Sequence, residues 1–274
     1  MSEVVTARNG EASSRSNASS APRIELRGIR MGWQQRSVLD GVDLAVWPGE
    51  LVSILGASGA GKSTLLRVAA GLMAPGAGEV RVDSTPLTGA RPDVALAFQD
   101  PCLLPWLSVE RNVAFGLEFR RQPRLARSVR QARVEAALRA VGLAHAAHFA
   151  PRELSGGMAQ RAALARALAR EPRTLLLDEP FGALDEVTRA DMQRLLVQVV
   201  RDTQAATLLV THDIDEALLV SDRIVVLGRG GISLNLKIDV PAPRERQVQA
   251  LGALRVDLVT ALHESMARTL APHS

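Results

Sequence analysis

The sequence predicts an α/β fold with a mainly parallel sheet, and two features of the chain support this. Short apolar runs, each suited to a buried strand, occur at residues 51–55, 94–98, 174–178, 207–211 and 224–227. Segments with helical spacing of apolar residues separate the runs, beginning with residues 62–70. Strands that alternate with helices form parallel sheets whose two faces are both covered.

The N-terminal region predicts a smaller antiparallel β part. Residues 1–22 are rich in Ser, Ala and Asn, and we expect them to be disordered. Residues 24–33 (IELRGIRMGW) and 42–50 (VDLAVWPGE) are typical of strands, and a turn is expected between them around residues 39–41 (LDG).

The middle of the chain predicts an inserted helical subdomain at about residues 100–155. Arginine-rich helical patterns dominate there, as in residues 128–143 (SVRQARVEAALRAVGL). The tail combines a strand at residues 234–240 (LNLKIDV) with a final amphipathic helix. We therefore predict a main domain at residues 23–235 and a short C-terminal extension at residues 236–274.

Composition narrows the cellular setting and the partners. The 274 residues, 47% of them hydrophobic, suffice for an ample core. No run of about 18 apolar residues is present, so we expect no transmembrane helix, and the N-terminus lacks the apolar segment of a signal peptide. Cys102 is the only cysteine, which fits a reducing cytosol. A net charge of +4 is compatible with nucleic acid or an anionic membrane. However, acids are interspersed among the arginines and tyrosine is absent, so we expect no nucleic-acid partner.

A glycine-rich turn after the run at residues 51–55 fits the phosphate-binding pattern G-x-x-x-x-G-K-[ST]. The glycines let successive backbone N–H groups point into one concavity, and the helix N-terminus adds positive partial charge. The residues predicted to bind ATP here are Gly56, Ala57, Ser58, Gly59, Ala60, Gly61, Lys62, Ser63 and Thr64. Lys62 can bridge the β- and γ-phosphates, and Ser63 can offer its hydroxyl to Mg²⁺. The alternative is an ordinary glycine-rich turn with an exposed lysine, which the full spacing disfavours.

Two acids end the apolar run at residues 174–178 (TLLLD). In parallel sheets ligands bind at the carboxyl ends of the strands, so Asp178 is the candidate Mg²⁺ ligand. Glu179 follows it and is the candidate base that polarises the attacking water. The alternative is a solvated pair of acids at a strand end, which the upstream phosphate loop makes the minority interpretation.

Four motifs together resemble the ATP-binding subunit of ABC transporters. They are "GASGAGKST" (56–64), "LSGGMAQR" (154–161), "LLLDEP" (175–180) and "VTHD" (210–213), and they occur in the family's order and approximate spacing. The resemblance spans about residues 24–231. It implies a P-loop NTPase with a RecA-like core, and an enzyme that hydrolyses ATP with the help of Mg²⁺.

The resemblance also assigns roles outside the phosphate loop. Gln99 matches the glutamine that senses Mg²⁺ and the membrane subunits, and His212 matches the histidine that contacts the γ-phosphate. Ser155, Gly156 and Gly157 match the signature, which contacts the γ-phosphate held by the other subunit.

Three further positions carry weaker assignments. Asp185 in "GALD" resembles the acid of the loop that couples the two sites. Trp33 lies where family members often place a tyrosine that stacks on adenine, and an indole face suits this stacking. The alternative is that Trp33 is an ordinary surface residue. Met158 stands where glutamine is frequent, and we expect little consequence because Ser155 and the backbone make the anion contacts.

Two segments resemble one branch of the family, the importers of nitrate, sulfonates and taurine. "LLPW" after Gln99 is frequent in that branch, and residues 232–244 (ISLNLKIDVPAPR) resemble the aliphatic sulfonate importers in particular. Leu103, Leu104 and Trp106 can instead simply pack the helical subdomain. Taurine, nitrate or a pyrimidine precursor is the alternative solute, and a soluble non-transport ABC ATPase is the remote alternative.

The resemblance implies a multisubunit complex. Two copies of this chain would form a homodimer that works with two integral membrane permease subunits and an extracytoplasmic solute-binding protein. The chain would then be peripheral, at the cytoplasmic face of the inner membrane.

Overall fold

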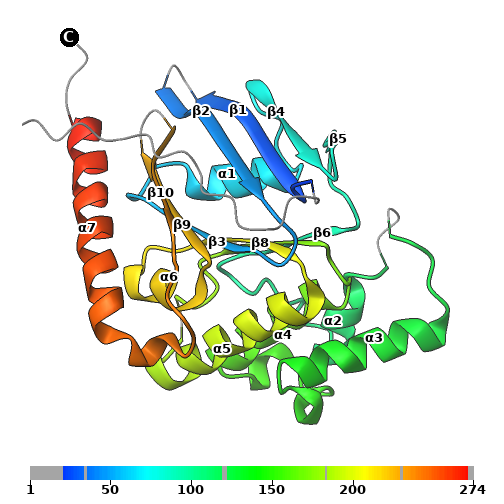
Figure 1. The fold of residues 1–274 in the computed structure, drawn as a ribbon. Helices are drawn as coiled ribbons and strands as arrows, with labels where there is room; N and C mark the ends of the chain where they lie inside the picture. The colour runs from blue at the N-terminus through cyan, green and yellow to red at the C-terminus, as the bar shows by residue number, and fades with distance from the viewer. Residues whose placement is uncertain (1–20, 34–35, 119–121, 183, 229–230, 271–274) are drawn as a thin grey trace, which may run out of the picture.

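The computed structural model describes residues 21–33, 36–118, 122–182, 184–228 and 231–270, with side chains for all of these except residues 33, 36 and 266–270. Most of the segment expected to be disordered therefore lies outside the described residues. The described chain passes from an antiparallel sheet through a parallel core to a final helix (Figure 1).

A six-stranded sheet forms the centre of the molecule, with the strand order β10-β9-β3-β8-β7-β6. Its parallel members are β3 (Leu51–Leu55), β6 (Val94–Ala97), β7 (Thr174–Asp178), β8 (Ala206–Val210) and β9 (Arg223–Gly228). The edge strand β10 (Gly231–Lys237) runs antiparallel to β9. The prediction of an α/β fold with a mainly parallel sheet is confirmed.

A smaller antiparallel sheet lies over one face of the central sheet (Figure 1). It contains β1 (Ile24–Trp33), β2 (Arg36–Val46), β4 (Ala77–Val82) and β5 (Thr85–Pro86). The turn expected at residues 39–41 is wrong, because β2 continues through them. Ile29 pairs with Val42 whereas Met31 pairs with Leu39, so β2 carries one extra residue in a bulge. Gly41 in the bulge takes a positive φ of 67°, which glycine tolerates.

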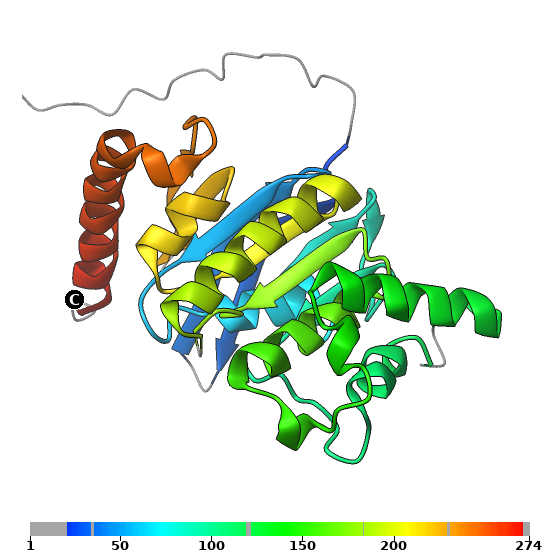
Figure 2. The same cartoon turned by 90° about the horizontal axis from the view of Figure 1, so that it is seen from below.

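Helices cover both faces of the central sheet (Figures 1 and 2). They are α1 (Lys62–Ala69), α2 (Val109–Phe115), α3 (Arg127–Ala140), α4 (Gly156–Leu168), α5 (Glu186–Thr203), α6 (Ile214–Val220) and α7 (Val248–Leu270). Successive side chains of β7 divide between two cores: Leu176 packs with α1 and the antiparallel sheet, whereas Leu175 and Leu177 pack with α4 and α5. Burial on both faces explains why the strand is apolar at successive positions.

The helical region packs as one unit beside β6. Val113 of α2, Val134 and Leu138 of α3 and Ala162 of α4 are buried in the same core cluster. This cluster continues into the hydrophobic core beneath the central sheet. The N-terminus of α4 is therefore held in a fixed position.

The C-terminal segment is part of the same body. The boundary predicted at residue 235 falls inside β10. That strand belongs to the central sheet, where it pairs with β9. Leu258 of α7 is fully buried against α6, β9 and Ile238. None of the helices in the described ranges is long and apolar enough to cross a membrane.

Candidate nucleotide-binding and hydrolysis site

The phosphate loop joins the end of β3 at Leu55 to the start of α1 at Lys62. Its glycines are required by close packing as well as by backbone conformation. A Cβ on Gly56 would lie 2.4 Å from the carbonyl oxygen of Leu227, and Gly61 caps α1 with a φ of 93°. The tight loop therefore leaves its backbone N–H groups and the N-terminus of α1 facing one concavity, which suits phosphate.

Lys62 lies folded into this loop. Its Nζ donates to the carbonyl oxygens of Gly56 at 2.8 Å and Ala57 at 3.0 Å. Burial lowers the pKa of Lys62, while the negative charges of Glu179 and Asp178 oppose that shift. The carbonyls compensate the buried ammonium, and a phosphate oxygen could replace them.

Ser63 and Asp178 meet at the floor of the site. The Ser63 hydroxyl donates to Oδ1 of Asp178 at 3.0 Å. Burial raises the pKa of Asp178, and the hydrogen bond from Ser63 opposes this. Oxygen donors of this kind suit Mg²⁺, which proteins usually hold through one or two carboxylates together with phosphate oxygens and water. Over the described ranges, no three His, Cys, Asp or Glu side chains gather to hold a metal unaided, so the pair fits an ion shared with phosphates.

Glu179 brings together three of the predicted residues. Its Oε2 lies 3.2 Å from Nδ1 of His212 and accepts a long hydrogen bond of 3.4 Å from Nε2 of Gln99. Glu179 has a positive φ of 45°, unusual for a non-glycine residue, and its N–H donates to the carbonyl of Val210 at 2.9 Å. Such strained backbone persists only where neighbouring structure enforces it, and it is common at functional sites.

A cavity of about 400 Å³ opens between these groups. It is lined by Val38, Gly56, Ser58, Gly59, Gly61, Lys62, Ser63, Thr64, Glu179 and His212. The structure thus brings the phosphate loop and two hydrolysis candidates to one hollow. Val38 of β2 was missed by the sequence analysis because a single valine in a strand carries no functional signal.

The loop that holds Gln99 is anchored by α4. Arg166 donates to the carbonyl oxygens of Cys102 at 2.8 Å and Pro101 at 2.6 Å. Burial lowers the pKa of this arginine. Arg166 was not predicted, because an arginine on an arginine-rich helix resembles its solvated neighbours.

The signature residues lie away from this hollow. Ser155 is the N-cap of α4, and its hydroxyl accepts from the N–H of Met158 at 3.3 Å. Gly156 and Gly157 form the first turn of the helix. Within the described part of the chain, neither Ser155 nor these glycines lines the cavity at the phosphate loop. One subunit alone therefore does not bring the two groups together.

Asp185 also caps a helix. It accepts from the N–H of Thr188 at 3.0 Å and from the hydroxyl of Thr188 at 2.7 Å, at the start of α5. These hydrogen bonds, the backbone one first, lower the pKa of Asp185. A Cβ on Gly157 would lie 2.7 Å from Cγ2 of Thr188, so the signature turn touches this cap.

The predicted adenine contact is Trp33. Trp33 ends β1, but its side chain lies outside the described residues, and its stacking role stays a prediction. The ring of Trp47, the other tryptophan of this region, lies 5.6 Å from the guanidinium carbon of Arg223. That cation–π contact already engages the Trp47 ring.

The segment that follows Gln99 is held by a buried side chain. Asn112 of α2, fully buried, accepts from the N–H of Leu104 at 2.7 Å and donates back to its carbonyl at 3.1 Å. Leu103 packs partly against the helical core, whereas Trp106 is 75% exposed. Core packing therefore explains Leu103 but does not explain Trp106.

Sequence reasoning also missed a buried carboxyl beside the hydrolysis residues. Glu216 of α6 is 5% exposed and helps to line a small polar cavity of about 50 Å³ that Glu179 and His212 also line. Burial raises the pKa of Glu216 to about 7, against a hydrogen bond from Thr211 that lowers it. In the sequence, Glu216 stands three residues after Asp213. That spacing predicts a helix N-cap and gives no indication that Glu216 is buried.

Comparisons with known proteins agree with this geometry. Residues 39–182 match the family model described as ABC transporter. The aliphatic sulfonates import ATP-binding protein SsuB 1 of Xanthomonas axonopodis pv. citri (strain 306) is 48% identical over 90% of this chain and 98% of that protein. SsuB of Pseudomonas entomophila (strain L48), another aliphatic sulfonates import ATP-binding protein, is 47% identical over 87% of each chain.

Solved structures agree as well. The ATP-binding cassette MJ0796, in a dimeric post-hydrolysis state bound to ADP and Pi, matches with a TM-score of 0.70 and 31% identity over 80% of this chain and all of that one. The cbiO1 protein of Clostridium perfringens, part of the ABC transporter complex cbiONQ, matches with a TM-score of 0.74 and 28% identity over 87% and 96% of the two chains. The resemblance indicated by the four motifs is confirmed, and the chain belongs to the ABC transporter family.

Proposed function

We propose that this chain is the ATP-hydrolysing subunit of an importer for aliphatic sulfonates. The observation that carries the enzymatic part is the position of Glu179, whose carboxylate meets His212 and Gln99 at the mouth of the phosphate-loop cavity. The sulfonate part is supported by the names of the relatives, which are aliphatic sulfonates import ATP-binding proteins at 47–48% identity. A taurine, nitrate or pyrimidine-precursor importer is the alternative within the same branch.

The side chains divide the chemistry of hydrolysis among them. Lys62 exchanges its contacts with Gly56 and Ala57 for phosphate oxygens and balances their charge. Ser63 and Asp178 would hold Mg²⁺, which would supply positive charge to the phosphates. Glu179 orients the attacking water and accepts its proton, and His212, whose Nδ1 lies 3.2 Å from Oε2 of Glu179, helps to hold that carboxylate in place.

Hydrolysis on this scheme requires two copies of the chain. The start of α4, with Ser155, Gly156 and Gly157, does not line the cavity at the chain's own phosphate loop and would contact the γ-phosphate held by the partner. Dimeric structures of the similar cassette MJ0796 support this arrangement. Nucleotide favours the closed dimer only through its greater affinity for that state.

The partners follow from the proposed role. Two permease subunits would span the membrane, and an extracytoplasmic binding protein would deliver the solute to them. This chain would sit at the cytoplasmic face of the inner membrane. A sulfonate is charged at any physiological pH and does not cross the bilayer core unaided, so it needs a protein route, and ATP hydrolysis would drive uptake along it.

The catalytic assignment is tested by Glu179→Gln. The variant should bind ATP, lose nearly all turnover, and accumulate as an ATP-bound dimer, because the γ-phosphate persists between the two copies. Size-exclusion chromatography with ATP and a phosphate-release assay measure both effects. Glu264→Gln, an exposed glutamate on α7, is the matched control. Wild-type turnover in Glu179→Gln removes the residue from this role.

The solute is tested by growth. Deleting the gene should abolish growth on an alkanesulfonate as sole sulfur source and leave growth on sulfate intact. Complementation with the wild type should restore growth, and complementation with Lys62→Ala should not. A deletion strain that grows on alkanesulfonates but fails on taurine or nitrate would keep the importer branch and contradict the sulfonate assignment.

A further inference from the structure

His212 is held in place by its backbone rather than by packing around its side chain. That side chain is 66% exposed, although its Nδ1 lies 3.2 Å from Glu179. Asp213 directly after it caps α6, accepting from the N–H groups of Asp215 and Glu216. The N–H of Asp213 in turn donates to the hydroxyl of Thr211 at 3.0 Å. His212 therefore lies between Thr211, whose N–H donates to the carbonyl of Ile54 in β3, and the capped start of α6, and its position depends on both.

The other end of α6 is held by Arg244 of the C-terminal segment. Its Nη1 donates to the carbonyl oxygens of Ser221 at 2.5 Å and Leu218 at 3.3 Å, where the helix ends. These carbonyls have no partner within the helix, so the guanidinium satisfies groups that would otherwise depend on water. Arg244 is partly buried, and burial lowers its pKa while the charge of Asp222 opposes that shift.

Arg244 also ties α6 to the edge of the central sheet. Its Nε donates to the carbonyl of Val240 at 3.1 Å, and its Nη2 to that of Ile238 at 3.4 Å. The N–H of Ile238 donates to the carbonyl of Asp222, whose own N–H donates to the carbonyl of Leu51 in β3. The Arg244 side chain thus links the end of α6 by hydrogen bonds to residues 238–240, and Ile238 in that segment is bonded through Asp222 to the central sheet.

Helix α7 adds apolar support. Leu258 is fully buried against Ala217 and Leu218 of α6. Arg255 donates to Asp215 at 2.8 Å, near the start of α6, but both side chains are more than half exposed. Exposed ion pairs contribute little, so Arg244 and the apolar contact carry most of the restraint.

We propose that Arg244 is a positioning residue for His212: by holding the C-terminal end of α6, it fixes the helix start that places His212 against Glu179. The inference rests on the proposed role of His212 in hydrolysis. It gives the C-terminal segment a part in turnover, although Arg244 touches no reacting group.

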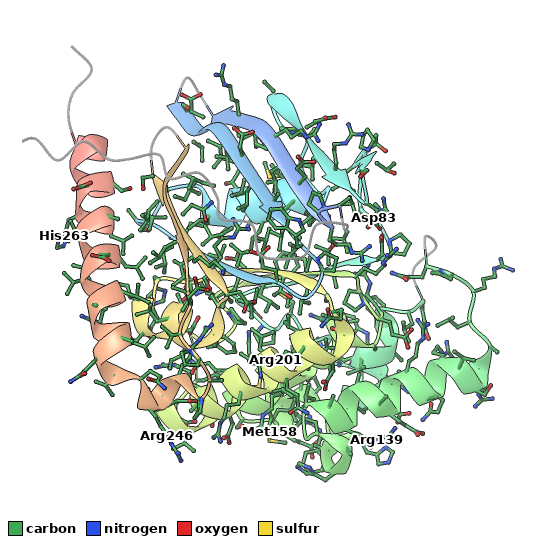
Figure 3. The ribbon with its side chains drawn as sticks, in the orientation of Figure 1. Asp83, Arg139, Met158, Arg201, Arg246 and His263 are labelled. Carbon is green, nitrogen blue, oxygen red and sulfur yellow. The ribbon has the colours of Figure 1, made fainter. Side chains whose placement is uncertain are left out.

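The test compares Arg244→Gln with Arg246→Gln in the purified protein. Both change an arginine to glutamine in the same short 3-10 helix, but Arg246 is exposed and lies at the outer edge of the molecule (Figure 3). We expect Arg244→Gln to lower kcat about tenfold with an unchanged KM for ATP, because misplacement of a catalytic group affects turnover rather than phosphate-loop binding. Arg246→Gln should change neither, and Arg244→Lys should recover part of the loss. Amide hydrogen exchange should quicken in α6 of Arg244→Gln alone.

A His212→Ala background separates positioning from general stability. If Arg244 acts through His212, Arg244→Gln should add no further loss of kcat there. The same fold loss in both backgrounds, or a rise in KM to match the fall in kcat, would overturn the inference. If Arg244→Gln keeps the wild-type kcat while His212→Ala is slow, the inference about Arg244 is wrong and the proposed role of His212 stands. Wild-type kcat in His212→Ala overturns the proposed role of His212, and the inference with it.

Discussion

Replacing Glu216 with glutamine should change the way that stability depends on pH. This side chain is 5% exposed, and burial raises its pKa to about 7 from an ordinary 4.5. Three charged groups face it: Asp213 and Glu179 raise the pKa further, and Arg189 of α5 lowers it. Glutamine keeps the shape and has no charge to bury, so it isolates the cost of ionising the buried carboxyl.

The sign follows from the raised value. The folded protein holds the proton of Glu216 more tightly than the unfolded chain, so the stabilisation from this group is complete below pH 4.5 and is lost as pH rises through about 7. At about 1.36 kcal/mol per pKa unit the whole effect is about 3 kcal/mol, most of which falls between pH 5 and pH 8. Glu216→Gln should lack this loss.

Urea unfolding at pH 5, 6, 7 and 8 measures the effect. The free energy of unfolding of Glu216→Gln minus that of the wild type should rise by about 2–3 kcal/mol from pH 5 to pH 8. The exposed Glu264→Gln on α7 should show no such trend. Parallel curves for Glu216→Gln and the wild type would refute the reasoning, because they would mean that Glu216 titrates alike in both states.

Three further variants test the nucleotide site. Ser155→Arg should leave ATP binding to the monomer intact but abolish dimerisation with ATP and turnover, since a bulky cation replaces the cap of α4; full activity would contradict the signature assignment. Trp33→Ala should weaken ATP binding about tenfold to a hundredfold, at roughly 1–3 kcal/mol for a stacked base, and Trp33→Phe should recover most of it in a titration. Gly157→Ala should slow turnover because its Cβ would lie 2.7 Å from Cγ2 of Thr188, and Thr188→Ser in the same chain should restore much of the rate by removing that methyl group. No recovery in this double variant would exclude the steric cause.

The sequence predicted best what local patterns determine. The run at β3, the glycine turn and the start of α1 are contiguous, so the pattern of residues 51–69 was enough to predict these elements and their order. Asp178 could be placed at the floor of the site because parallel strands end at one edge of the sheet. The prediction of a turn at residues 39–41 was wrong because the structure there depends on a distant partner. Pairing with β1 determines where β2 bulges.

Long-range packing decided the features that were missed. Glu216 resembles an ordinary helix-cap residue along the chain, and only the approach of α5 and the Glu179 loop buries it. Arg244 belongs to a tail that resembles one importer branch, yet its contacts run to the end of α6. Neither residue differs in its local pattern from a solvated neighbour, so sequence reasoning had no signal to separate them.

Contacts in the structure join the signature turn to Asp185, whose coupling role stays a prediction. Gly157 in the signature turn packs against Thr188, and Thr188 donates both its N–H and its hydroxyl to Asp185. The next residue of α5, Arg189, donates to the carbonyl of Leu184 at 3.0 Å and lines the polar cavity shared with Glu179. A partner's nucleotide bound at the signature turn would therefore press on the cap of α5, and α5 begins beside the chain's own hydrolysis residues.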